Sequence, residues 1–194
     1  MYQSLFCESS LYRSLLSLDE AHGASIQEQG CVCGGRLHLA RYPRKPRGGP
    51  AEIEAEAEFR RRLSYCCAVC RRRSTPGSVL FLGRKVYFGA VVVLVSVLRQ
   101  GANPARLSQL QEWLGVSGRT VRRWRDWWLK DFVKSRLWRA GRGRVRGSFD
   151  ERRLPLSLLE SFEGEGVQEK LVGLLQFVRP LTIGRAACAA DRAI

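Results

Sequence analysis

Histidine is scarce in this chain, which contains two among its 194 residues. General-base catalysis near neutral pH relies most often on histidine, so the chain is poorly equipped for it. The sequence also lacks a Ser, His and Asp arrangement, a phosphate-binding loop and a dinucleotide-binding fingerprint. We therefore predict that the protein is not an enzyme and that it binds no small-molecule substrate.

Long hydrophobic runs are also absent. The most apolar stretch covers residues 86–98, which is 13 residues and short of the roughly 20 that a membrane-spanning helix needs. It predicts a buried helix and no membrane partner. The start of the chain has neither a basic segment nor an uninterrupted apolar stretch, which argues against a signal peptide. We expect a cytoplasmic, nucleoid-associated protein whose cysteines are reduced.

Acidic residues are few relative to basic ones, since 18 Asp and Glu against 33 Lys and Arg give a net charge of +15. Residues 99–146 hold 13 basic and 3 acidic residues, whereas residues 147–194 hold 6 and 7. Nearly all of the positive charge is arginine, whose planar guanidinium group binds phosphate and guanine edges through paired hydrogen bonds. The charge therefore predicts a nucleic acid as the partner of the segment 99–146.

Cysteine, in contrast, is plentiful, with seven residues of which most are clustered. Cys31 and Cys33 form a Cys-x-Cys pair, and Cys67 and Cys70 form a Cys-x-x-Cys pair. Clustered thiols in a reducing compartment indicate a metal, and structural Zn²⁺ takes four such ligands, two from each of two turns. We predict a structural zinc ion bound by these four cysteines.

Two further residues, Cys66 and His38, are alternative candidates for the metal ligands. Cys66 and Cys67 would point to opposite faces of a strand, so only one of them can be a ligand. Cys67 is the better choice because it has the usual spacing from Cys70. His38 could replace a missing ligand, although a lone histidine in a strand is more often a surface or stacking residue. Reduced cysteines without any metal are a further alternative. A redox dithiol at Cys67 and Cys70 is another, although no βαβ pattern surrounds this pair.

Hydrophobic periodicity and the positions of glycine and proline divide the chain into five segments. In chain order these are a helical segment at 1–30, a zinc-ribbon-like module at 31–82, a helix-turn-helix domain at 83–140, a mobile basic Gly/Arg linker at 141–154 and a helical segment at 155–194. Helices are expected at 4–22, 155–162 and 167–178, and residues 51–63 form a short helix or an acidic loop. The predicted fold class is mainly α, in which a small β module precedes a tri-helical domain and C-terminal helices.

The most specific motif is LSQLQEWLGVSGRTVRRWRDWW at residues 107–128. Its first part places three leucines on one helical face and then a glycine that ends the helix; these residues are Leu107, Leu110, Leu114 and Gly115. Gln111 departs from the pattern, because the motif prefers a small residue where its two helices approach closely. The spacing nevertheless predicts a helix-turn-helix.

The second helix of this motif, expected at 117–128, has one apolar and one basic face. Val121, Trp124 and Trp128 are spaced three and four apart and should be buried. The remaining face can contact base edges in the major groove and neighbouring phosphates. The predicted DNA-binding residues are Ser117, Arg119, Thr120, Arg122, Arg123 and Arg125. Auxiliary nucleic-acid contacts are predicted from the β module, at Arg44, Lys45, Arg47, Arg71, Arg72 and Arg73.

Three stretches together resemble a known family: CGGRLHLARYPRKPRG, YCCAVCRRRSTPGSVLFLGRKVY and LGVSGRTVRRWRDWW. They are similar to short bacterial insertion-sequence-associated proteins, in which a zinc-ribbon-like part precedes a helix-turn-helix of the transposase type. The span from the first stretch to the last, residues 33–128, covers about half of the chain. The resemblance implies DNA binding at element ends or at regulatory sites, and it supplies no catalytic domain.

Strand transfer by a transposase needs three carboxylates on two metal ions within a domain of well over a hundred residues, and residues 147–194 are too few for one. We therefore expect a sequence-specific double-stranded DNA-binding protein of mobile-element type. A second copy or another transposition protein would be a further partner. The alternatives are a zinc-containing RNA-binding or ribosome-associated protein, and a truncated enzyme that depends on a partner for its acidic residues.

Overall fold

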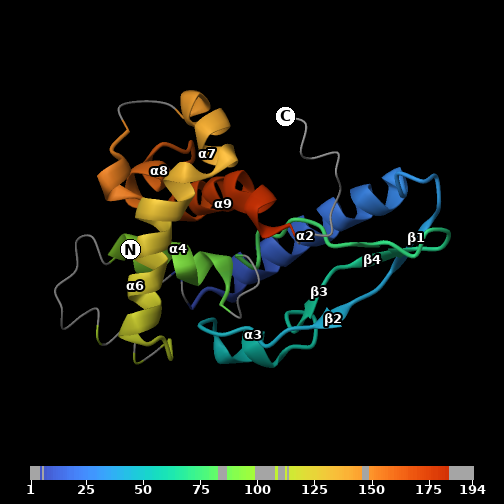
Figure 1. Ribbon diagram of the computed structural model, residues 1–194. Helices are drawn as coiled ribbons and strands as arrows, with labels where there is room; N and C mark the ends of the chain where they lie inside the picture. The colour runs from blue at the N-terminus through green and yellow to red at the C-terminus, as the bar shows by residue number, and fades with distance from the viewer. Residues whose placement is uncertain are drawn as a thin grey trace.

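Helices make up most of the computed structural model, which describes residues 5, 7–82, 87–98, 108, 112, 114–145 and 149–183 (Figure 1). The α-helices in this part of the chain are α2 (Ser9–Gln29), α3 (Ala51–Ala55), α4 (Gly89–Leu98), α6 (Gly118–Asp126), α7 (Arg136–Gly141), α8 (Leu156–Glu160) and α9 (Val167–Val178). A π-helical turn, Trp127–Asp131, continues α6, and 3-10 helices lie at Phe132–Lys134, Arg142–Arg144, Glu151–Arg153 and Arg179–Thr182. The prediction of a mainly α protein is confirmed.

The strands form two small antiparallel sheets. One has the order β1 (Leu37–Leu39), β4 (Tyr65–Cys67) and β5 (Arg73–Ser74), and the other pairs β2 (Tyr42–Pro43) with β3 (Arg61–Arg62). Both sheets lie within the segment where a small β module was expected, and α3 is inserted between β2 and β3. Figure 1 shows the β1–β4 end of this module on the far right, alongside the C-terminal half of α2 and on the side opposite α6.

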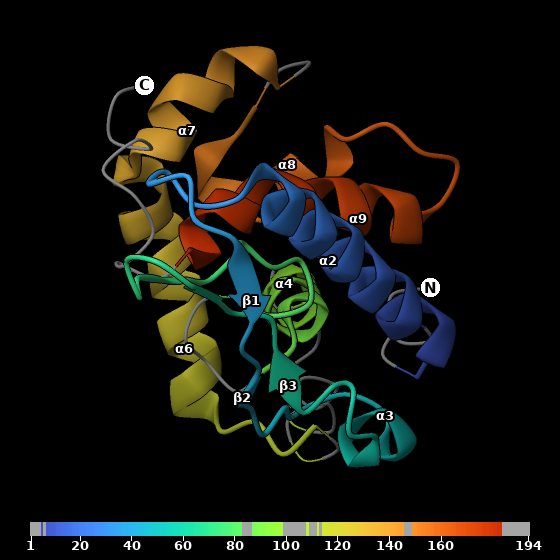
Figure 2. The same cartoon turned by 90° about the vertical axis from the view of Figure 1, so that its right-hand side faces the viewer.

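The apolar helix α4 lies at the centre of the hydrophobic core. Residues 89–97 of this helix are all buried, as expected from the run of valines and leucine. Figure 2 shows α4 nearly end-on, with α2, α6 and α9 around it. Phe88, directly before α4, contacts the ring of Tyr12 in α2 with centroids 4.9 Å apart. The core therefore joins helices from the beginning, the middle and the end of the chain.

Helix α2 starts later and ends later than the helix expected at 4–22. It continues through Gly23. A β-carbon at this position would lie 2.6 Å from the hydroxyl of Tyr65. The glycine thus permits close approach of α2 to the β module. The helix ends before Gly30, whose positive φ of 74° favours glycine. The C-terminal helices agree better with the sequence, since α9 has the expected bounds and α8 lies within 155–162.

The segment expected to be a mobile linker is instead partly packed against the body. Gly141 is buried, and a β-carbon at this position would lie 2.8 Å from the ring of Phe177. Trp138 donates a hydrogen bond from Nε1 to Glu151 at 2.9 Å and packs against Phe149 with centroids 4.8 Å apart. These anchors lie at the edges of the Gly/Arg run, which explains why its composition alone indicated a linker. Residues 146–148 lie outside the described part of the chain.

A buried polar network connects α2 to the β module and to the 3-10 helix that follows α9. Asp19 accepts hydrogen bonds from the hydroxyl of Ser78 and from the backbone N–H of Val79, the latter at 2.7 Å. Ser78 donates its backbone N–H to Thr182 Oγ1 at 2.7 Å. Arg62 donates to the carbonyl oxygen of Thr182 at 2.6 Å. Burial raises the pKa of Asp19 above its usual value, although these hydrogen bonds oppose the shift.

The raised pKa of Asp19 predicts a pH-dependent contribution to stability. A carboxyl group whose pKa is higher in the folded than in the unfolded state stabilises the fold most at low pH, and this contribution falls as the pH rises through the folded-state value. We expect the free energy of unfolding of the wild type, relative to Asp19→Asn, to decrease as the pH rises above the usual range of an aspartate pKa. Urea unfolding at several pH values would measure this difference, with Asp131→Asn at an exposed position as the control. A difference that grows with pH would contradict the assignment.

Candidate functional site

Four cysteines from two separate turns come together at the β1–β4 end of the molecule. The sulfur atoms of Cys31, Cys33, Cys67 and Cys70 all lie within 4.8 Å of one another. The closest pairs are Cys33 with Cys67 at 3.5 Å and Cys31 with Cys70 at 3.6 Å. All four are free thiols. These are the four cysteines that the sequence predicted as metal ligands, and they lie close enough to hold a metal ion.

The first turn depends on two glycines that follow Cys33. Gly34 has a φ of +78° and donates its N–H to the carbonyl oxygen of Cys31 at 2.8 Å, which closes the turn. A β-carbon on Gly35 would lie 2.6 Å from the sulfur of Cys67. The absence of a side chain at Gly35 therefore leaves the space that this sulfur occupies.

The second turn directs a backbone donor at a sulfur atom. The N–H of Cys70 donates to the sulfur of Cys67 at 3.5 Å, and this bond contributes most to lowering the pKa of the Cys67 thiol to about 6. Arg71 closes the turn with a φ of 58°, a left-handed conformation that is uncommon for a residue other than glycine. Its N–H donates to the carbonyl oxygen of Cys67 at 3.2 Å. The turn thus favours a thiolate at Cys67, which is the form that binds metals.

The pairing of β1 with β4 sets the distance between the two turns. Leu37 lies opposite Cys67, and His38 lies opposite Cys66. The N–H of Ala68 also donates to the carbonyl oxygen of Arg36 at 2.9 Å. Because neighbouring residues in a strand face opposite sides, this register buries Cys67 in the cluster and turns Cys66 away.

The residues left open as alternative ligands do not join the cluster. The sulfur of Cys66 faces the carbonyl oxygen of Arg71 at 3.7 Å. His38 is exposed and is not part of the group of possible ligands found among the described residues. Cys7 lies outside the group as well, and Cys188 lies outside the described residues. The preference for Cys67 over Cys66 therefore agrees with the geometry.

The spacing of the four sulfurs fits a tetrahedral metal site. Zn–S bonds of about 2.3 Å in a tetrahedron place the sulfurs about 3.8 Å apart. The observed separations lie around this value, from 3.5 Å up to the limit of 4.8 Å. Four sulfur ligands leave no open coordination position, which is typical of a structural site and not of a catalytic one.

One exposed apolar residue lies inside each cysteine pair, and it is not among the site residues predicted from the sequence. Val32, between Cys31 and Cys33, and Val69, between Cys67 and Cys70, are each 70% exposed. Both lie on the tips of the turns because the adjacent cysteines face inward. The sequence signal that could have identified these exposed valines was an apolar residue inside each cysteine pair, with arginine following the pair.

Helix α6 has the capped start and the two faces that the sequence predicted. The hydroxyl of Ser117 accepts a hydrogen bond from the N–H of Thr120 at 3.3 Å. Val121 and Trp124 are each only 1% exposed, and the ring of Trp124 contacts Tyr87 with centroids 5.1 Å apart. The arginines of the helix are all exposed; these are Arg119, Arg122, Arg123 and Arg125.

These arginines are not held by acidic side chains of the described residues. The ion pair found on this helix joins Asp126 to Lys130 at 3.2 Å, one turn further along. Within the described part of the chain, no carboxylate pairs with an arginine of α6. The guanidinium groups of this face are therefore available to an external anion.

Much of the first helix of the predicted helix-turn-helix lies outside the described residues. This applies to Leu107, Leu110, Gln111 and Trp113. The described residues that follow agree with the expected turn, since Gly115 has a φ of +60° and both Leu114 and Val116 are buried. The approach of the two helices at Gln111 therefore remains a prediction.

The sequence predicted that the second helix of the motif would continue regularly to residue 128, but α6 ends at Asp126. It changes at Trp127 into a π-helical turn, in which the N–H of Phe132 donates to the carbonyl oxygen of Trp127. A π-helical turn places residues five apart on one face, and the rings of Trp127 and Phe132 lie 5.7 Å apart. The aromatic residues Trp128, Phe132 and Trp138 are all buried in the core.

The predicted auxiliary contacts fall into two separate groups. Arg71, Arg72 and Arg73 are exposed beside the cysteine cluster, at the end of the molecule opposite α6 (Figure 1). Lys45 and Arg47 are exposed in the segment after β2, whereas Arg44 is half-buried and donates to the hydroxyl of Tyr42 at 2.9 Å. The structure therefore does not gather all the predicted nucleic-acid residues into one surface.

Helix length gives a separate finding about membranes. Helix α4 is ten residues long, and no described helix has both the length and the apolar character required to traverse a bilayer.

Comparisons with protein-family models, with curated proteins and with solved structures found no match to this chain.

Proposed function

We propose that the protein binds double-stranded DNA in a sequence-specific manner through α6 and its N-terminal turn. The observation that carries this proposal is the exposed arginine face of α6 above the buried Val121 and Trp124. The major groove admits an α-helix, and arginine forms bidentate contacts with guanine O6 and N7. The buried residues fix the helix on the core, so the arginines would enter the groove in a defined orientation.

The roles within α6 follow from position. Arg119, Arg122 and Arg123 occupy the first turns of the helix and would contact base edges or adjacent phosphates. Ser117 and Thr120 lie at the helix N-terminus, where the positive end of the helix dipole favours a phosphate. Arg125 lies further along and would contact the DNA backbone.

The cysteine cluster would hold one structural Zn²⁺ ion. Cys31, Cys33, Cys67 and Cys70 fit a tetrahedral site, and the ion would join the two turns and rigidify the β module. The four sulfurs would fill the coordination sphere, so the proposal assigns the ion no catalytic role.

The proposed biological setting is that of a mobile element. The resemblance to insertion-sequence-associated proteins supports a regulator or the DNA-recognition part of a transposase, without catalytic activity of its own. A second copy or another protein of a transposition complex would be the further partner. Inverted terminal repeats flanking the reading frame would test this setting directly.

A second candidate function is recognition of structured RNA by the cysteine module. The specific observation in its favour is the position of the cysteine turns, which lie at the end of the molecule opposite α6 (Figure 1). There, the exposed Val32 and Val69 lie beside exposed arginines. Sequence-specific RNA recognition combines stacking or apolar contacts to unpaired bases with arginine contacts to the backbone.

Single replacements on α6 test the leading proposal. A preferred duplex would first be selected from a random library, and its affinity would then be measured for Arg122→Ala and Arg123→Ala. Each lost base contact is expected to weaken binding by about 1–3 kcal/mol and to relax the sequence preference. Arg152→Ala, which removes an exposed arginine outside α6, is the control and should retain wild-type affinity. Unchanged affinity in both α6 variants would exclude this helix as the DNA reader.

DNA binding and RNA binding must be compared at the same salt concentration, because the affinity of a basic protein for a nucleic acid depends steeply on ionic strength. The selected duplex and a structured RNA of similar length would be compared at one salt concentration. Tighter RNA binding that depends on Arg71–Arg73 and not on Arg122 would favour the second candidate.

A further inference from the structure

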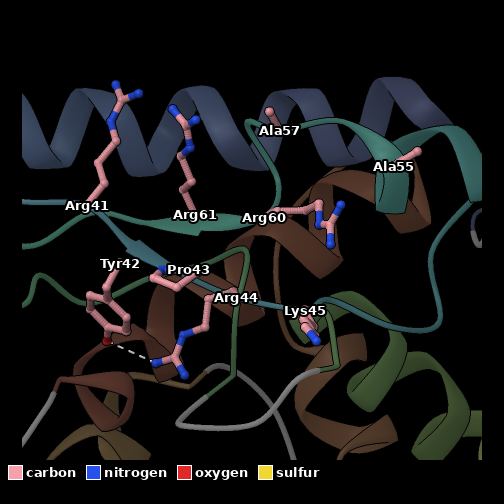
Figure 3. A pocket seen from close by; sticks show the side chains of 9 residues that line it. All are labelled: Arg41, Tyr42, Pro43, Arg44, Lys45, Ala55, Ala57, Arg60 and Arg61. Carbon is pink, nitrogen blue, oxygen red and sulfur yellow. Dashed lines mark hydrogen bonds between the residues drawn. The ribbon is translucent and has the colours of Figure 1, made fainter.

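An open pocket of about 380 Å³ lies between the β2–β3 pair and the end of α3. Residues from both strands and from the segment that joins α3 to β3 form its lining (Figure 3). They are Arg41, Tyr42, Pro43, Arg44, Lys45, Ala55, Ala57, Arg60 and Arg61. The sequence analysis gave no role to Arg41, Arg60 or Arg61.

The lining is unusual in its charge. It contains five cationic side chains and no carboxylate. Pockets for uncharged small molecules are mostly lined by hydrophobic and aromatic groups with a few polar ones. A lining with positive charges and no negative one attracts an anion. The chemistry of the lining therefore points to an anionic ligand.

The sequence keeps nearby acidic residues out of the pocket. Alanine and glutamate alternate in this part of the chain, and it is Ala55 and Ala57 that line the pocket. Glu54 instead accepts the N–H of Gly49 at 3.1 Å, and Glu56 pairs with Arg13 at 2.6 Å. Glu54 and Glu56 are thus engaged elsewhere, and neither they nor Glu58 contributes to the lining of the pocket.

The pocket arginines have no acidic partner within the described residues. No ion pair there involves Arg41, Arg60 or Arg61. Arg44 lies over the ring of Tyr42, with its guanidinium carbon 4.7 Å from the ring centroid. The Nε atom of Arg44 is buried and has no hydrogen-bond partner among the described residues.

The strand pair fixes the positions of these side chains. Pro43 lies opposite Arg61, and the N–H of Arg44 donates to the carbonyl oxygen of Arg60 at 2.6 Å. Figure 3 shows Arg41 and Arg61 projecting side by side from one side of the strand pair, with Arg44 and Tyr42 on the other. The cations are therefore presented by paired backbone and not by a free loop.

We propose that this pocket is a phosphate-binding site. Arginine presents planar pairs of N–H donors that match phosphate oxygens, and a phosphate offers several acceptor oxygens to more than one cation. The ligand would be a phosphate group, supplied either by a free phosphorylated compound or by the backbone of a nucleic acid. This site is distinct from α6 and goes beyond the duplex recognition proposed above.

The position of the pocket makes both sources accessible. The β2–β3 pair and the N-terminal end of α6 lie toward the same end of the molecule, the lower end in Figures 1 and 2. A nucleic acid held by α6 could reach the pocket with a phosphate of its backbone, whereas a small phosphorylated compound needs no contact with α6.

Calorimetric titration of the full chain with inorganic pyrophosphate tests the site. The double variant Lys45→Ala/Arg60→Ala removes two exposed cations whose side chains form no ion pair with described residues. It should weaken pyrophosphate binding by about tenfold or more. Ala57→Glu, which adds a carboxylate to the lining, should weaken binding to a similar extent. The matched control Arg152→Ala/Lys170→Ala also removes one arginine and one lysine, at positions away from the pocket, and should bind pyrophosphate as the wild type does.

Duplex binding by the same variants identifies the source of the phosphate. If the pocket variants weaken duplex binding and pyrophosphate competes with the duplex, the nucleic-acid backbone supplies the phosphate. If only pyrophosphate binding falls, the ligand is a free phosphorylated compound. The proposal is overturned if the pocket variants change neither measurement, or if the control lowers both equally. Arg122→Ala should leave pyrophosphate binding intact, because Arg122 does not line the pocket. The duplex affinity of this variant tests the α6 proposal, and pyrophosphate binding tests the pocket, so the two proposals can fail independently.

Discussion

Cys67→Ser is expected to abolish zinc binding, lowering the metal content from about one zinc per chain to none by elemental analysis. Cys67 is the most buried of the four clustered cysteines, and its sulfur accepts the N–H of Cys70. A serine hydroxyl is a poor zinc ligand, because it does not ionise near neutral pH as a thiol can. Residues that merely orient a ligand account for about 10–100-fold in metal affinity, so the loss of a ligand should exceed that range.

The β module should lose its order together with the metal. The strands β1, β4 and β5 contain two or three residues each, which is too short for independent stability. The buried hydrophobic residues of the β1–β4–β5 sheet form a small cluster of Leu37, Tyr65 and Cys67, separate from the main core. We therefore expect Cys67→Ser, or treatment of the wild type with a chelator, to increase amide hydrogen exchange in β1 and β4 and to leave α4 and α9 protected.

Cys66→Ser provides the matched control, since it changes the adjacent residue of the same strand. The thiol of Cys66 faces the carbonyl oxygen of Arg71, which a serine hydroxyl could also contact. This variant should keep its zinc and its hydrogen-exchange protection. A wild-type protein that is free of metal and fully protected in β1 and β4 would refute the zinc proposal. Equal zinc loss in the two variants would refute the assignment of Cys67.

The cysteine cluster could be predicted from the sequence because its determinants are local. The pairs at Cys31 and Cys67 each have a spacing that lets two sulfurs face one point, and glycines follow the first pair. The choice between Cys66 and Cys67 also followed from local geometry, because adjacent residues of a strand face opposite sides. The apolar faces of α4 and α6 were equally visible, since a regular period of buried residues is a property of the helix alone.

Other features depend on contacts between distant residues, and the sequence pattern did not indicate them. The hydrogen bonds of Asp19 join α2 to residues about 60 positions away, so an isolated aspartate in a helix carried no signal. The basic pocket beside β2 and β3 forms only when these strands pair across an inserted helix. Composition cannot reveal that pairing. The π-helical turn after α6 arises where Trp127, Trp128 and Phe132 all pack together, and it overrides the regular period of 3.6 residues.

Trp124→Ala should destabilise the protein by about 3–5 kcal/mol, the usual cost of truncating a fully buried aromatic side chain. Trp124 is 1% exposed and packs edge-on against Tyr87. It lies on the buried face of α6, directly beneath the arginines proposed to contact DNA. The cavity left by alanine would therefore loosen the helix that orients Arg122 and Arg123. Urea unfolding measures the stability loss, and duplex affinity at a temperature where the variant is still folded measures the loss of orientation.

Trp124→Phe separates the packing role of this residue from any polar role. The Nε1 atom of Trp124 is buried without a hydrogen-bond partner among the described residues, so phenylalanine removes a donor that contributes no bond there. We expect this variant to lose less stability than Trp124→Ala, because phenylalanine keeps one aromatic ring in the space and leaves a smaller cavity, and to keep most of its duplex affinity. If Trp124→Ala were folded, as stable as the wild type and equally tight on DNA, α6 would not depend on its buried face for orientation. The arginines would then act as a diffuse charge, and sequence-specific reading by this helix would have no structural basis.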